Sequence, residues 1–237
     1  MKPVNVIIPI LVLTISSLMA TDDSSEPPAN SSPSLVQITD DPKLPRVLLI
    51  GDSISMGYTL QVRALLSGVA NVHRPPTNCG STHAGVLNLD KWLGDGKWDV
   101  IHFNWGMHDL KYLSNGKQNV PIANYEKNLR EIVSRLKKTG ATLIFATTTP
   151  LPNDTTGVYE RHAEEELKYN TVAVQVMKDN KVDVDDLHAV TEPQIAKLHS
   201  PDGVHFNSDG CKVLANQVAV SISKALDERK STSAATK

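Results

Sequence analysis

Short apolar runs alternate with segments of helical periodicity between residues 47 and 226, and this alternation constrains the fold more than any other feature of the sequence. The first run, at 47–50, is continuous and ends at Gly51, which is typical of a strand buried on both faces. Further strands are expected at 70–73, 100–103, 141–146 and 182–184. Strands separated by helices predict an α/β fold, in which a parallel sheet of about five strands carries helices on both faces.

Between the strands, apolar residues recur three and four positions apart, which is the spacing of a buried helix face. Helices are therefore expected at 56–66 and 82–93, in a segment that Gly140 closes, over about twenty residues from Arg161, and in a last helix with Leu214, Val218, Ile222 and Leu226 on one face. The chain of 237 residues is long enough for one sizeable domain. We expect this domain at 46–229, followed by a disordered tail at 230–237.

The N-terminal region differs in composition from the predicted domain. Lys2, an apolar run at 6–13 and small residues before Ala20 predict a secretory signal peptide at 1–20, and hence a secreted or periplasmic protein. The run is shorter than the ~20 residues of a membrane-spanning helix, so we expect no stable membrane insertion after cleavage. Residues 21–45 are rich in Ser, Pro, Asp and Asn, which predicts a disordered leader.

Charge and histidine spacing argue against two classes of function. The 24 Lys and Arg are nearly matched by 26 Asp and Glu, and no basic stripe is present, so nucleic acid is not an expected partner. The eight histidines include no His-x-x-x-His pair, and no cysteines are paired at metal-binding spacing. The sequence therefore predicts no metal site.

A candidate nucleophile follows the first predicted strand. Gly51-Asp52-Ser53 ends that strand and opens the next helix, so Ser53 lies at the carboxyl edge of the sheet, where open parallel sheets form their binding crevice. On such a turn the hydroxyl is presented outward and the backbone N–H is free to donate. The alternative is that Ser53 only caps the helix.

Asp202 and His205 are the candidates for the rest of a catalytic triad. They stand three residues apart, across Gly203, just before the last predicted helix. This spacing allows the carboxylate to bind one ring nitrogen and leaves the other as acceptor for a serine proton. The alternative is a helix-entry turn, in which Asp202 binds local backbone and His205 is packed.

Two loops between these segments are candidates for holding an oxyanion. Gly80 follows the second strand, and without a side chain its N–H can approach a substrate closely. His108 follows the third strand. The alternatives are that Gly80 only forms a turn and that His108 is a buried histidine with satisfied hydrogen bonds.

Threonines at 147–155 follow the fourth strand. Their hydroxyls either face substrate or belong only to a loop. The predicted substrate-binding residues stand beside these motifs: Asp52, Asn104, Trp105 and Asp109. For Trp105, stacking on a sugar ring competes with a place in the core.

The order and spacing of these motifs resemble the SGNH or GDSL hydrolases. Gly-Asp-Ser at 51–53, the lone Gly80, Gly-x-x-Asp at 106–109 and Asp-x-x-His at 202–205 match along essentially the whole predicted domain. The resemblance implies a three-layer α/β/α sandwich similar to flavodoxin, and an esterase, lipase or carbohydrate deacetylase that needs no metal or other cofactor. By position it implies that Ser53 is the nucleophile and first oxyanion donor, that Gly80 is the second donor, and that Asp202 and His205 complete the triad.

The third motif departs from the family pattern. Gly-x-Asn-Asp is usual, with the Asn amide as third oxyanion donor, whereas this chain has Gly106-Met107-His108-Asp109. A neutral imidazole donates one N–H, so we expect His108 to replace the amide, as in similar secreted bacterial members; loss of the donor is the alternative. Removing one such donor typically lowers kcat by about 10²–10³-fold.

The sequence thus predicts a serine esterase that removes a small acyl group, acetyl above all, from a small-molecule or polysaccharide ester. The alternatives are a lipase or lysophospholipase, and a carbohydrate-binding protein on a hydrolase fold that has lost catalysis.

Cys79 and Cys211 are the only cysteines. Both lie at the active-site end of the predicted sheet, so an exported protein allows a disulfide between them; two free buried thiols are the alternative.

Overall fold

Five parallel strands form a single sheet in the computed structural model, which describes residues 32–155 and 160–235. The order across the sheet is β2-β1-β3-β4-β5. The strands are β1 (Arg46–Ile50), β2 (Asn71–His73), β3 (Val100–Phe103), β4 (Thr142–Ala146) and β5 (Asp183–Asp185). The predicted α/β fold is therefore confirmed, and the strand order is the flavodoxin-like one. The predicted signal peptide lies outside the described residues.

The central strands form because their sequences are apolar on both faces. Residues 47–50 of β1 and all of β3 are almost completely buried, as expected where helices cover both sides of a parallel sheet. His102 of β3 is a polar exception. Its Nε2 lies 3.0 Å from Oδ2 of Asp185 in β5, and Gln217 donates to Oδ1 of the same carboxylate at 2.7 Å. These bonds satisfy polar groups that burial would otherwise penalise.

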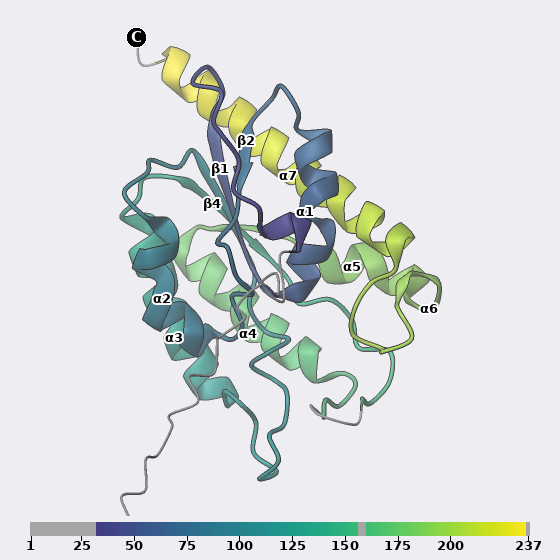
Figure 1. The fold of residues 1–237 in the computed structure, drawn as a ribbon. Helices are drawn as coiled ribbons and strands as arrows, with labels where there is room; N and C mark the ends of the chain where they lie inside the picture. Colours follow the sequence, from purple (N-terminus) through teal and green to yellow (C-terminus); the bar gives the residue numbers. More distant parts are fainter. Residues whose placement is uncertain (1–31, 156–159, 236–237) are drawn as a thin grey trace, which may run out of the picture. The chain divides into compact units, whose positions relative to one another are not determined.

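Helices cover the two faces of the sheet (Figure 1). On one face α1 (Ser53–Leu65) packs against α7 (Ser208–Ala235), and α5 (Leu187–Thr191) also contacts α7. On the other, α3 (Ile122–Lys137) lies between α2 (Thr82–Leu93) and α4 (Glu165–Asn180). Three short helices complete the described part: η1 (Pro33–Leu35), η2 (Glu192–Gln194) and α6 (Ile195–Leu198). No helix of this part is long and apolar enough to cross a membrane.

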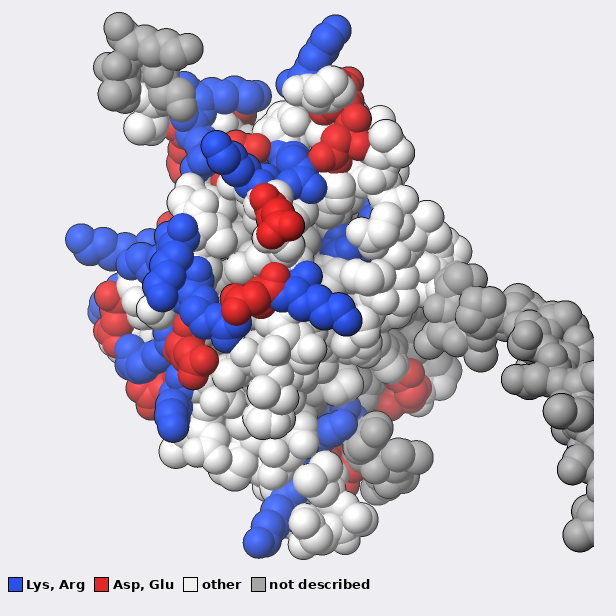
Figure 2. All heavy atoms as spheres, turned by 60° about the vertical axis from the view of Figure 1, so that its left-hand side comes forward, with Lys and Arg blue, Asp and Glu red and all other residues white. Residues whose placement is uncertain are grey.

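The α2–α3–α4 layer carries charges of both signs on its outer surface. Arg130 pairs with Glu126 and Asp179, and Arg135 pairs with Asp90. The space-filling view shows basic and acidic side chains interleaved on this side of the molecule (Figure 2). Exposed pairs of this kind contribute little to stability, so the layer is held mainly by its apolar face: Tyr125, Leu129, Ile132, Val133 and Leu136 are fully buried.

Two helices, α4 and α1, begin at other residues than predicted, because of the hydrogen bonds that the residues before them make. The helix expected from Arg161 begins at Glu165, because Glu160 accepts a hydrogen bond from the backbone of Tyr112 and Arg161 pairs with Thr155 in an isolated β-bridge. Conversely, α1 begins three residues before the predicted start at 56, because the Asp52 side chain accepts a bond from the N–H of Ile54 and caps the helix.

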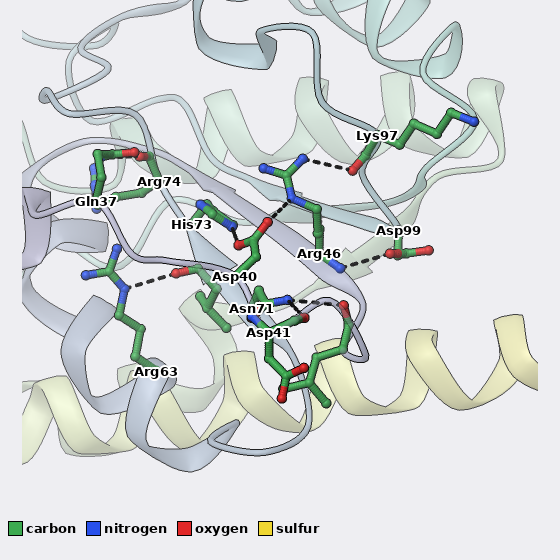
Figure 3. A network of polar contacts seen from close by, with 12 residues as sticks. Gln37, Asp40, Asp41, Arg46, Arg63, Asn71, His73, Arg74, Lys97 and Asp99 are labelled. Atoms are coloured by element: carbon green, nitrogen blue, oxygen red, sulfur yellow. Dashed lines mark hydrogen bonds and ion pairs between the residues drawn. The ribbon is translucent and has the colours of Figure 1, made fainter.

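The predicted disordered leader is wrong for its described part. We call residues 33–45 the N-terminal strap; it carries η1 and is bonded to the region around β2 (Figure 3). Asp40 binds both His73 Nε2 (2.5 Å) and Arg46 Nε (2.7 Å). The Asn71 amide donates to the carbonyls of Asp41 and Leu44. The polar residues that suggested a solvated segment instead bind partners far along the chain.

The predicted disordered tail is also wrong in its described part, since α7 continues to Ala235. Arg229 fixes this end of the helix: its guanidinium donates to the carbonyl of Gly140 at 3.1 Å and pairs with Asp99. Beyond it, the hydroxyls of Ser231 and Thr232 donate to carbonyls four residues earlier. The Ser, Thr and Lys residues that suggested fraying are therefore compatible with an extended helix.

Candidate active site

Three side chains far apart in the sequence meet at the carboxyl edge of the sheet. The hydroxyl oxygen of Ser53 lies 2.7 Å from Nε2 of His205, and Nδ1 of the same ring lies 2.7 Å from Oδ2 of Asp202. Ser53 follows β1, next to β3, at the point where the strand order reverses direction. Open α/β sheets bind their ligands at this point, and the arrangement is that of a serine nucleophile with an oriented base.

The loop before α7 fixes the orientation of the base. Oδ1 of Asp202 accepts the backbone N–H groups of Val204 (2.9 Å) and His205 (2.8 Å), while Oδ2 binds the ring. Although partial burial acts in the opposite direction, these bonds lower the pKa of Asp202 to about 2. The carboxylate is therefore charged at neutral pH and holds the ring with Nε2 facing the serine.

The turn that carries Ser53 leaves its backbone N–H available. Ser53 is the first residue of α1, where backbone N–H groups have no acceptor within the helix. The capping side chain of Asp52 accepts a hydrogen bond from the N–H of Ile54 and not from that of Ser53. The N–H of Ser53 therefore stands at the positive end of a helix of thirteen residues, which favours negative charge at this position.

A cavity of about 420 Å³ opens over the serine. We call it the Ser53 cavity. Four of its lining residues are predicted site residues: Ser53, His108, Asp202 and His205. The others are Asn78, Met107, Thr155, Arg161 and Val204. Its volume is in the range of small-molecule sites, and most of its lining side chains are polar.

His108 is placed in the Ser53 cavity as a neutral imidazole. Burial lowers its pKa, and the nearby positive charges of Lys111 and Arg161 act in the same direction against the charge of Asp52. A neutral ring donates a single N–H, which is what the expected oxyanion role requires. The loop is fixed by Asn119, whose amide donates to the carbonyl of His108 at 2.8 Å.

Gly106 allows this loop to pass close to Thr148, in the segment that follows β4. A Cβ at Gly106 would lie 2.0 Å from the hydroxyl oxygen of Thr148, a distance that no side chain can tolerate. Glycine is thus required two residues before His108 by the close approach of the two segments.

Gly80 adopts the left-handed backbone conformation that favours glycine, with φ of +58°. Its N–H, however, donates to Oδ1 of Asn78 at 3.0 Å. Asn78 is an exposed lining residue of the Ser53 cavity, so its side chain occupies the donor that a substrate oxygen would use. For Gly80 to act as predicted, the amide of Asn78 has to turn away.

The predicted substrate-binding residues do not line the Ser53 cavity, because their side chains serve the fold. Trp105 is fully buried and stacks on Trp92, so it belongs to the core. Asp52 is buried and caps α1. Asn104 donates to the carbonyl of Ala146 at 2.8 Å. The structure thus places these three side chains in the fold and not in the lining of the cavity.

Asp109 is buried behind His108. Its Oδ1 accepts the backbone N–H of Thr82 at 2.9 Å and also the Thr82 hydroxyl, whereas its Oδ2 has no partner. Burial raises the pKa of this carboxyl to about 7, although the bonds from Thr82 act against the shift. Asp109 thus joins the loop after β3 to the start of α2 and is not among the residues that line the Ser53 cavity.

Arg161 is the main lining residue that the motifs did not indicate. It belongs to none of the four motifs, yet its Nε donates to the carbonyl of Met107 at 3.2 Å. Thr155, which does fall in the noted threonine run, lies beside it in the cavity lining. Thr147, Thr148 and Thr149 of the same run are buried.

The two cysteines are free and buried, so the proposed disulfide is not formed. The Sγ of Cys79 lies near the carbonyl of Thr77, whereas that of Cys211 lies near the carbonyl of Phe206. Burial raises the pKa of the Cys79 thiol to about 11, which keeps it protonated. The alternative of two buried thiols is the one observed.

Comparison with known proteins gives relatives of one kind. A GDSL esterase/lipase of Arabidopsis thaliana is 32% identical over 120 residues, which cover 44% of this chain and 49% of that protein. The chain thus spans about half the length of this curated relative. An acetyl xylan esterase, AlAXEase, has a similar structure, with a TM-score of 0.65 and 16% identity over 75% of this chain and 99% of its own.

The lipase/acylhydrolase of Enterococcus faecalis is similar in fold to the same degree, with a TM-score of 0.64 and 21% identity over 76% of this chain and 96% of that one. At such identities the likeness shows the fold alone. The sequence model of the GDSL-like lipase/acylhydrolase family matches residues 49–213, which contain all four predicted motifs. This chain therefore belongs to the GDSL-like lipase/acylhydrolase family.

Proposed function

We propose that the protein is a serine esterase that hydrolyses small acyl esters through an acyl-enzyme on Ser53. The observation that carries this proposal is the continuous contact from the hydroxyl of Ser53 through the ring of His205 to Asp202. Family membership supports the same class of reaction. A serine that only capped a helix would have no reason to contact an imidazole whose other nitrogen is held by a carboxylate.

The first step is attack on the ester carbonyl. His205 takes the proton of Ser53 at Nε2, and the serine oxygen forms a bond to the carbonyl carbon. The backbone N–H groups of Ser53 and Gly80 bind the oxyanion, with the ring of His108 as third donor. The amide of Asn78 leaves Gly80 at this stage. As the tetrahedral intermediate collapses, His205 gives its proton to the leaving alcohol.

The second step releases the acid. Water donates a proton to His205 and attacks the acyl carbon, and the proton then returns to Ser53 as the ester bond to the enzyme breaks. Asp202 remains a carboxylate throughout at neutral pH, because its hydrogen bonds lower its pKa to about 2 against the opposing effect of partial burial.

We propose acetyl as the acyl group and a carbohydrate as the alcohol. One similar structure is an acetyl xylan esterase, and the Ser53 cavity of about 420 Å³ has only two apolar residues in the described part of its lining, Met107 and Val204. A lipase would need a longer apolar channel for its acyl chain. Rates on p-nitrophenyl esters from acetate to dodecanoate separate the two: the proposal expects a steep fall beyond four carbons, and a maximum at long chains would contradict it.

The test of the catalytic proposal uses Ser53→Ala beside the wild-type chain. Wild type should hydrolyse p-nitrophenyl acetate and be labelled by a fluorophosphonate probe at Ser53, identified by peptide mass. The variant should fold with the same thermal midpoint and show neither property. A non-catalytic carbohydrate-binding protein would fail to react in both forms, and this result would overturn the proposal.

We also propose that the enzyme acts after export from the cytoplasm. Support comes from the predicted signal peptide at 1–20. Expression of the full chain in a secreting host should give a protein whose N-terminus lies near residue 21, as measured by intact mass. Retention of Met1 in an exported product would contradict cleavage.

A further inference from the structure

Arg74 is a buried arginine that none of the sequence motifs includes. It follows β2 directly and is only 1% exposed. Its five N–H donors meet five acceptors. Nη1 donates to the hydroxyls of Ser55 (3.1 Å) and Thr59 (3.0 Å), Nη2 to the carbonyls of Gly51 (3.1 Å) and Thr77 (3.4 Å), and Nε to the carbonyl of Pro75 (3.4 Å).

No carboxylate in the described part of the chain lies within ion-pair distance of this guanidinium. Burial accordingly lowers the pKa of Arg74, although the nearby thiol of Cys79, Tyr58 and the carboxylate of Asp52 act against this shift. A buried charge held only by neutral oxygens is costly for stability. A role beyond packing would explain why an arginine stands here.

The groups that Arg74 binds belong to the two segments that supply the oxyanion donors. Gly51 stands two residues before Ser53, and Thr77 stands three residues before Gly80. The same two segments are also joined by the backbone, since Cys79 donates to the carbonyl of Gly51 at 3.2 Å. Nη2 of Arg74 lies between the segments and contacts a carbonyl of each.

We propose that Arg74 is a positioning residue that sets the separation of the Ser53 and Gly80 N–H groups, so that both reach the oxyanion of the transition state. The inference rests on the proposed esterase activity and extends it to a residue that does not touch substrate. The planar fork matters as much as the charge, because only a guanidinium reaches hydroxyls on α1 and carbonyls on both segments at once.

The test compares Arg74→Lys with Arg63→Lys. Arg63 is a matched control: it lies on α1, and its Nε donates to the carbonyl of Val72 at 3.0 Å, close to Arg74 but away from both donor segments (Figure 3). Both substitutions keep the charge and remove the fork. Arg74→Lys should lower kcat on p-nitrophenyl acetate about 10–100-fold with KM within about twofold, since misplaced groups cost this much. Arg63→Lys should leave kcat within about twofold.

A second readout separates positioning from stability. A boronic acid that forms a tetrahedral adduct with Ser53 should lose affinity in Arg74→Lys by the same factor as kcat/KM, whereas KM should hardly change. Retained kcat in a folded Arg74→Lys would overturn the inference, and so would an equal loss in Arg63→Lys. If wild type itself neither turns over nor is labelled at Ser53, the esterase proposal fails first, and the two failures are thus distinguished.

Thr59→Val provides a milder variant should Arg74→Lys not fold. It removes one of the five acceptors in an almost isosteric way, at a side chain that is fully buried. We expect a three- to tenfold lower kcat with unchanged KM. A folded Thr59→Val with wild-type kcat and wild-type affinity for the boronic acid would count as refutation.

Discussion

Two imidazole–carboxylate pairs in this protein have similar contact distances, and we propose different roles for them. His73 and Asp40 join β2 to the N-terminal strap, with 2.5 Å between Nε2 of the ring and Oδ1 of the carboxylate. His205 and Asp202 lie at the Ser53 cavity, with 2.7 Å between Nδ1 and Oδ2. The side chain of His73 is 10% exposed, whereas that of His205 is 45% exposed. The contact distance between ring and carboxylate therefore does not distinguish the proposed catalytic pair from the structural one.

The other partners of each pair do distinguish them. Asp40 also binds Arg46, and the ring of His73 meets the edge of Trp98, with the ring centroids 5.3 Å apart. The second ring nitrogen of His205, Nε2, instead contacts the hydroxyl of Ser53. A carboxylate shared with an arginine stabilises a fold, whereas a carboxylate that orients a ring toward a nucleophile supports proton transfer.

The largest expected effect comes from removing each imidazole in turn. His205→Ala should lower kcat on p-nitrophenyl acetate by about 10⁴-fold or more, because the serine loses its base. His73→Ala should keep kcat within about twofold but reduce the free energy of unfolding by about 1–3 kcal/mol, measured by urea denaturation, since a buried bond to a carboxylate is lost. Equal losses of activity in the two variants would break the comparison.

A smaller loss of kcat is expected from substitutions of His108. Unlike His73 and His205, this histidine forms no ion pair with a carboxylate within residues 32–155 and 160–235. His108→Ala should lower kcat about 10²–10³-fold through the missing donor. His108→Asn should restore most of the loss, because an amide also donates an N–H, and should do so without changing the thermal midpoint. If alanine and asparagine give the same kcat as wild type, the oxyanion is bound without residue 108.

The smallest effect concerns stability and sharpens the contrast between carboxylates. The pKa of Asp109 is raised to about 7, whereas that of Asp202 is lowered to about 2. Between pH 4 and 7 the unfolded chain loses the Asp109 proton that the folded protein keeps, so this residue lowers stability as pH rises through that window and contributes a constant cost above it.

Asp109→Asn should therefore gain stability relative to wild type as pH rises from 4 to 7, by up to a few kcal/mol. Urea unfolding of both proteins at several pH values measures the difference, which should level off above pH 7. A difference that stays constant from pH 4 to 8 would show that the carboxyl ionises normally in the folded state.

Most of the fold was predictable because its signals are local. The apolar runs gave all five strands within one or two residues, and the stripe on α3 is buried as expected. The triad residues were predictable for the same reason: each sits in a short motif at a strand end or helix start. Ser53 lies at the carboxyl edge of the sheet because β1 ends there, and Asp202 and His205 reach it because they precede α7, which packs against α1.

The remaining features depend on contacts between distant segments, which a single sequence does not show. Asp40 looked like part of a solvated leader, and only its partners His73 and Arg46 reveal the strap. Trp105 stands in a polar loop, yet the neighbouring helices cover it. Arg74 resembles any arginine that follows a strand, and its role becomes visible only when its five acceptors are identified.

The strap has a consequence for how copies of this protein meet one another. β2 is an outer strand of the sheet, and an outer strand with open carbonyls and amides can recruit a strand from another molecule. Here Arg63 occupies the carbonyl of Val72, and Gln37 of the strap occupies that of Arg74. These side chains leave fewer groups for intermolecular strand pairing, so loss of the strap should favour aggregation along this border even where catalysis is unaffected.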